Sequence, residues 1–213
     1  MTLRKWCYLG LVLTIWGFSF RKPFDGSPEH FPAPAYQPEW SAQLEAQKQL
    51  GKVLFYEEAL SKDSTISCAS CHSPYNAFAH TDHDLSHGIR DQIGKRNAPG
   101  LFNLAWQKNL MWDGAVHHLE MQALAPLTDA SEMDNTLLEV VNRLNNSHLY
   151  PPLTAAAFGS STITGEQVLE ALAQFQASLV SANARYDKVK RGETTFSEQE
   201  ARGYQVFQQH CNA

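Results

Sequence analysis

The sequence predicts a mainly α-helical protein with long loops. Apolar residues recur at helical spacing wherever a period is clear, and two capping boxes mark helix starts in the second half of the chain. Glycines and prolines interrupt the stretch between Ser73 and Pro126, which predicts loops there. With 213 residues, 43% hydrophobic and 18% charged, the chain is long enough for one full domain and part of another.

Residues 1–26 are expected to form a signal peptide or an N-terminal anchor. Arg4 and Lys5 provide a basic start, and residues 6–20 are uncharged and mostly apolar. These 15 residues are fewer than the ~20 that a membrane-spanning helix needs. A buried core helix is the alternative, and the proline-rich residues that follow argue against it. We expect a periplasmic protein, anchored to the inner membrane if the segment is not cleaved.

The charge balance argues against a nucleic-acid partner. Residues 1–26 hold four basic residues and Asp25, so without them the 17 basic and 22 acidic residues fall to 13 and 21, a formal net charge of −8. A nucleic-acid-binding surface needs clustered positive charge instead. An acidic surface suits a basic soluble partner, although charge of this size also serves solubility alone.

The first helix is expected from about Pro38 to Phe55. Proline suits the first turn of a helix, and the apolar residues fall on one face at i, i+4, i+7 and i+8. These residues are Ala46, Leu50, Val53 and Leu54.

Three more helices are expected towards the C-terminus. Thr164 with Gln167 and Ser197 with Glu200 have the spacing of capping boxes, which start helices. An apolar stripe predicts a helix across 133–144, ended by a pair of asparagines. Its members are Met133, Leu137, Val140, Val141 and Leu144.

The loop stretch at 73–126 is long for a compact domain. Loops of this length without secondary structure are uncommon and are usually functional. We therefore expect this segment to wrap around a bound group or to form a site.

The segment Cys68-Ala69-Ser70-Cys71-His72 is the most specific motif in the chain. C-x-x-C-H attaches a c-type haem, because the two thiols add to the haem vinyl groups and the adjacent histidine ligates the iron. The motif therefore predicts one covalently bound haem.

Two other chemistries fit the same cysteines. A zinc site is possible because His80, His83 and His87 follow at workable spacings. A redox dithiol is the other alternative. The helical surroundings disfavour a thioredoxin-like unit, and the export signal favours haem attachment outside the cytoplasm.

A short repeat points to a second, incomplete unit. Residues 51–55 and 203–207 both have glycine, three residues and phenylalanine, and each precedes a cysteine. After the second copy, Cys211-Asn212-Ala213 has the start of another haem motif. We expect the chain to be truncated within that second motif.

Several short segments accompany the haem motif: 50–55, His87-Gly88, 95–99, 111–114 and 131–133. Together with that motif they resemble the bacterial di-haem cytochrome c peroxidases. This family includes the related enzyme that matures methylamine dehydrogenase. The resemblance implies a cytochrome c-like, N-terminal peroxidatic haem domain over 30–185 and the start of a truncated C-terminal haem domain over 186–213.

The resemblance also implies roles for two residues near the iron. His87 matches the distal ligand, which leaves the iron on activation, although His80 and His83 compete for that role. Glu132 matches the distal acid, which transfers the peroxide proton as base and then acid. From the sequence alone, the favoured interpretation of Glu132 is a first-turn helix glutamate stabilised by the helix dipole; the resemblance reverses that preference.

Three further residues receive roles. Trp112 resembles the tryptophan between the two haems, with a buried structural tryptophan as the alternative. Asn97 matches a calcium ligand, an oxygen donor suited to a hard cation. Arg96 has the geometry to bind a haem propionate in bidentate fashion.

The implied function is an oxidoreductase, a cytochrome-c peroxidase that reduces hydrogen peroxide to water. Electrons would come from a small cytochrome c or copper protein through a second haem, and the full-length protein would be a homodimer. An electron-transfer or sensing haem module without turnover, and a maturation-type di-haem oxidase, remain the alternatives.

Overall fold

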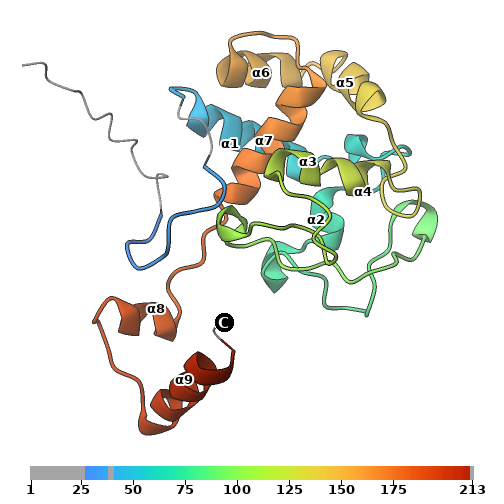
Figure 1. Cartoon of the computed structure of the whole chain (residues 1–213). Coiled ribbons are helices and arrows are strands. Elements are labelled where there is room, and N and C mark those ends of the chain that lie inside the picture. Colours follow the sequence, from blue (N-terminus) through green and yellow to red (C-terminus); the bar gives the residue numbers. More distant parts are fainter. Residues whose placement is uncertain (1–26, 38–40, 212–213) are drawn as a thin grey trace, which may run out of the picture.

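The computed structural model describes residues 27–37 and 41–211, which fold mainly into helices (Figure 1). The mainly α prediction is confirmed, since within those residues β-structure is limited to isolated bridges. The α-helices are α1 (Leu44–Phe55), α2 (Cys68–Cys71), α3 (Leu119–Gln122), α4 (Leu124–Thr128), α5 (Leu137–Asn145), α6 (Tyr150–Phe158), α7 (Gly165–Ala177), α8 (Arg185–Lys190) and α9 (Glu198–His210). Short 3-10 turns lie at Glu58–Leu60, Pro74–Asn76, Ile89–Asp91 and Leu104–Trp106.

Helices α1 and α7 cross at the centre of the main body (Figure 1). Their backbones meet at Gly51, where an added Cβ would lie 1.8 Å from the carbonyl oxygen of Ala171. Beside this crossing, Phe55 packs against Phe175 with ring centroids 5.1 Å apart and against Phe78 at 5.9 Å. This aromatic cluster joins the central helices to the loop that follows the haem motif.

Both capping boxes form as predicted. Thr164 accepts from the Gln167 backbone N–H at 3.3 Å, and the Gln167 side chain accepts from the Thr164 N–H at 3.0 Å. Ser197 and Glu200 make the same reciprocal pair at 3.3 and 2.7 Å. These boxes set the starts of α7 and α9.

Two predicted helix starts are wrong. The first helix begins at Leu44, its first buried residue, while Pro38 lies outside the described residues. The helix predicted from Met133 begins at Leu137, because the Thr136 side chain caps it by accepting from Glu139 N–H. Met133 is nevertheless buried. The apolar stripe therefore predicted the burial of Met133 correctly, but its place in a helix wrongly.

The segment 73–126 is mostly loop, as expected, with α3, most of α4 and short turns within it. Isolated antiparallel bridges close three of its loops: Ser73 with Ala79, His87 with Ile93, and Leu110 with Val116. Each bridge brings the ends of a seven-residue loop together, so these loops have fixed ends without being part of a sheet.

Helices α8 and α9 stand apart from the main body (Figure 1). Tyr186, Phe196 and Tyr204 pack together there, with ring centroids 5.3 to 6.4 Å apart. The segment 27–37 reaches this unit through His30, whose Nε2 lies 2.8 Å from Asp187 Oδ1. Across 27–37 and 41–211, no helix has the length and apolar character of a membrane span.

Candidate haem site

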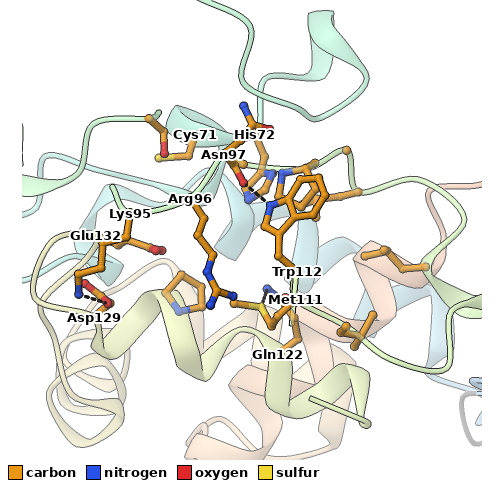
Figure 2. A pocket seen from close by; sticks show the side chains of 18 of the residues that line it. Cys71, His72, Lys95, Arg96, Asn97, Met111, Trp112, Gln122, Asp129 and Glu132 are labelled. Atoms are coloured by element: carbon orange, nitrogen blue, oxygen red, sulfur yellow. Dashed lines mark hydrogen bonds and ion pairs between the residues drawn. The ribbon is translucent and has the colours of Figure 1, made fainter. Parts of the chain in front are cut away.

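A cavity of about 530 Å³ lies between the haem motif and the loops that follow it. Figure 2 shows Cys71 and His72 on one side of it, Met111 and Gln122 on the opposite side, and Glu132 at the flank beside Lys95. Cofactor sites typically occupy 300–1,000 Å³. The volume therefore suits a large planar group between these two walls.

The cysteines lie on α2, a single turn of helix. Ser67 precedes this turn, and its N–H donates to Ser70 Oγ at 3.1 Å. Residues i and i+3 share a helix face, so this turn places Cys68 and Cys71 on the same side. Both are free thiols and partly buried, and His72 follows directly.

The surroundings of both thiols raise their pKa values. Burial raises the pKa of Cys68 to about 12, and the neighbouring Cys71 adds to that rise. Burial also raises the pKa of Cys71, against a hydrogen bond with Ser86 that lowers it. A reactive redox dithiol needs a lowered thiol pKa, so these surroundings do not favour the redox alternative.

The ring orientation of His72 is fixed by two backbone carbonyls. Its Nδ1 lies 2.8 Å from Phe78 O and 3.0 Å from Pro99 O. Carbonyl oxygens only accept, so Nδ1 carries the proton and Nε2 keeps its lone pair. Metal-ligating histidines are typically held in this way, which makes His72 Nε2 suited to bind a metal.

Glu132 lines the flank of the cavity, from a turn between α4 and α5. Its N–H donates to Asp129 O at 3.1 Å. The interpretation of Glu132 as a first-turn helix glutamate is wrong, because α5 begins only at Leu137. Burial raises the pKa of the Glu132 carboxyl, Asp129 raises it further, and Lys95 lowers it.

His87 does not line this cavity in the described structure. Its Nδ1 lies 2.5 Å from Asp91 Oδ1, and its side chain is 37% exposed. The backbone is nearer the motif, since Cys71 Sγ lies 3.7 Å from His87 O. Its role as distal ligand remains a prediction, and it would require the side chain to turn away from Asp91.

His80 and His83 stack beside His87. The His80 and His83 rings are 5.2 Å apart, and those of His83 and His87 are 5.0 Å apart. Within 27–37 and 41–211, however, no three His, Cys, Asp or Glu side chains are grouped to hold a metal ion. The zinc alternative therefore has no preformed ligand set in this part of the chain.

Arg96, Asn97 and Trp112 all line the cavity. Arg96 pairs with Asp113 at 2.8 Å, so binding a propionate would mean exchanging one carboxylate for another. The Trp112 indole N–H donates to Asn97 O at 2.7 Å, and Asn97 Nδ2 donates to Asp84 O at 3.1 Å. Trp112 is 64% exposed among the described residues, and its role between two haems remains a prediction.

The structure adds residues to the site that the sequence did not single out. Gln122 and Met111 face His72 across the cavity, and Lys95 pairs with Asp129 at 3.5 Å beside Glu132. Gln122 ends α3, a four-residue helix too short to show a sequence period. Met111 and Lys95 lie within matching segments, but nothing in their spacing indicates a ligand.

The domain is helical, its C-x-x-C-H motif opens into a cofactor-sized cavity, and its histidine is held for metal binding. These features together define the class of c-type haem proteins. The sequence profile of the family described as "Di-haem cytochrome c peroxidase" matches residues 45–195. The chain belongs to this family, and the predicted resemblance is confirmed.

Individual relatives lie in two groups. The chain is 38% identical to the methylamine utilization protein MauG of Methylophilus methylotrophus, over 84% of this chain and 52% of that protein. It is 32% identical to the cytochrome c peroxidase Ccp of Escherichia coli K12, over 86% of this chain and 40% of that protein. The chain thus spans about half the length, or less, of the curated relatives it matches.

Solved structures agree with this assignment. The crystal structure of a MauG-like protein associated with microbial copper homeostasis matches with a TM-score of 0.75 and 33% identity, over 84% of this chain and 53% of that one. The diheme peroxidase BthA of Burkholderia thailandensis matches with a TM-score of 0.68 and 27% identity, over 83% and 48%. The family implies haem c as the cofactor.

Proposed function

We propose that this chain binds one haem c through Cys68 and Cys71, with His72 as proximal ligand, and serves peroxide reduction. The observation that carries the proposal is the two-carbonyl clamp on His72 Nδ1, which frees Nε2 towards the cavity. The free thiols one helical turn apart and the cavity volume support the same cofactor.

When bound, the haem supplies a redox-active iron at which hydrogen peroxide is reduced to water. Glu132 holds and moves the proton, accepting it from the oxygen nearer the iron and giving it to the leaving oxygen. Its raised pKa suits this task, because a general acid and base works best with a pKa near the working pH. Asp129 raises the pKa of Glu132 and Lys95 lowers it, so the two neighbours act in opposite directions.

The surrounding residues support binding and electron transfer. Arg96 would exchange Asp113 for a haem propionate, and exposed Trp112 lies at the cavity wall where an electron could enter. His87 would bind the iron in the resting state and be released towards Asp91 on activation. Asn97 is proposed as a calcium ligand.

The whole enzyme would receive its electrons from a small cytochrome or copper protein. In the family this path uses a second haem, and the relatives' greater length leaves room for it. We propose a periplasmic location, for which the basic and apolar start of the sequence is the support.

A second candidate is oxidation of a protein substrate, as in maturation-type di-haem enzymes. It is favoured by the 38% identity to a methylamine utilization protein, against 32% to a cytochrome c peroxidase. The two functions differ in the electron source. Steady peroxide consumption that depends on a reduced cytochrome supports the peroxidase, whereas consumption only with an oxidisable protein supports the second candidate.

The first test is covalent haem attachment. Co-expressed with periplasmic haem-maturation proteins, the chain should gain the mass of one haem that survives denaturation, because thioether bonds are covalent. Replacing Cys68 and Cys71 together by alanine should abolish the gain, whereas Cys211→Ala, at an exposed thiol on the end of α9, should leave it unchanged. A haem-free protein that holds one zinc ion per chain would contradict the proposal.

A further inference from the structure

Met111 has an unusual position for a methionine. It lies in the loop closed by the Leu110–Val116 bridge, and its backbone is left-handed, with φ +67°. Residues that carry a Cβ rarely adopt that conformation, and such strain concentrates at functional sites. The loop therefore holds this side chain in place at some cost.

The conformation directs Met111 to the cavity wall opposite His72 (Figure 2). The amide Nε2 of Gln122 lies 3.9 Å from the Met111 sulfur, so the thioether has a polar partner at the end of α3. Of the residues that line the cavity, Met111 supplies a soft, neutral sulfur donor on this wall.

The same wall has no histidine in this arrangement. His87 turns outwards to Asp91, at 2.5 Å, and lies outside the residues that line the cavity. Glu132 offers a carboxyl oxygen rather than a sulfur, and the proposed function assigns that carboxyl to proton transfer. Met111 is thus the sulfur donor that the cavity lining offers across from His72.

We infer that the Met111 thioether is an alternative axial ligand, which binds the haem iron opposite His72 when His87 is turned towards Asp91. The inference rests on the proposed haem site. Histidine–methionine ligation raises the reduction potential of a haem relative to two histidines. An exchange of His87 for Met111 would therefore favour the reduced iron, and the weaker sulfur bond would yield to peroxide.

The test is spectroscopic and uses the haem-loaded 213-residue chain. His87→Gly removes the competing ligand, and the ferric protein should then show the weak long-wavelength charge-transfer band of thioether-bound iron. Adding Met111→Leu should abolish the band, convert the iron to a high-spin form and lower its reduction potential. Met121→Leu is the matched control, because Met121 is an exposed methionine of α3 outside the cavity lining.

The outcomes separate this inference from the proposed function. A haem-loaded His87→Gly protein without the thioether band, whose potential and spin state do not respond to Met111→Leu, overturns the inference and leaves the haem site intact. A band that Met121→Leu removes as well also overturns it. Failure to load haem at all would instead contradict the proposed function.

Discussion

At Gly51, where α1 and α7 are in contact, substitution by alanine has two opposing effects on the free energy of unfolding. Within a helix, Gly→Ala ordinarily stabilises by ~1 kcal/mol, because alanine has the higher helix propensity. Here the new Cβ would lie 1.8 Å from Ala171 O, 2.6 Å from its carbonyl carbon and 2.9 Å from Phe175 Cβ. The first two are backbone atoms of α7, so no side-chain rotation relieves the clash.

The size of the effect follows from the distance that must be recovered. An ordinary contact needs at least 3.4 Å, so the helices would have to separate by about 1.6 Å at this point. Overpacking of a core costs ~1–3 kcal/mol and occasionally more, and the propensity gain offsets ~1 kcal/mol of it. We expect Gly51→Ala to lower the free energy of unfolding by ~2 kcal/mol and Tm by ~4–8 °C.

Thermal unfolding of the haem-loaded chain, followed by circular dichroism, measures this effect. Gly203→Ala is the matched control, since Gly203 occupies the same place in the repeated motif on α9 and an added Cβ there meets nothing within 4 Å. That substitution should leave the main transition unchanged or raise it slightly. A Gly51→Ala protein as stable as wild type would refute the close backbone contact between α1 and α7.

Two further predictions concern pH. Asp129→Asn removes a charge that raises the pKa of Glu132 and frees Lys95 to lower it. The acid limb of peroxide consumption, measured with an artificial one-electron donor, should therefore move to lower pH. Glu132→Gln should abolish that limb and slow consumption ~10²-fold or more. A limb unmoved by either change would remove Glu132 from the chemistry. The hydrogen bond with His30 lowers the pKa of Asp187 in the folded protein. The pair therefore stabilises the fold fully above the ordinary carboxyl pKa of ~3.9. This stabilisation is lost as the pH falls through the lowered pKa of Asp187. Limited proteolysis between α7 and α8 should accelerate in that acid range, and Asp187→Asn should produce the acceleration at neutral pH. Equal cleavage rates at all pH values would show that the His30–Asp187 pair does not hold α8 in place.

The sequence could predict the features that are set locally. The capping boxes at Thr164 and Ser197 depend on two residues three positions apart, so their spacing alone identifies the starts of α7 and α9. The haem motif is equally local, since one helical turn places Cys68 and Cys71 together. The mainly helical class followed from the period of the apolar residues for the same reason.

The family resemblance added positions that no local pattern supplies. Glu132, Arg96 and Trp112 are distant in the sequence from the haem motif. They reach one cavity because the loops of 73–126 and the turn between α4 and α5 fold against that motif. Glu132 also shows the limit of local patterns. Its surroundings in the sequence suit a helix start, yet the Thr136 cap sets the helix boundary later.

Only the tertiary structure decided how the site is assembled. The tautomer of His72 depends on Phe78 O and Pro99 O, which reach it from two loops, and no sequence pattern encodes that meeting. The outward turn of His87 and the inward position of Met111 likewise depend on side-chain directions that spacing does not specify. Residue type and spacing therefore determined which cofactor the chain can bind, because covalent attachment and helical turns are local. Packing between distant segments determined which atoms face that cofactor, because long-range contacts set side-chain orientation and burial.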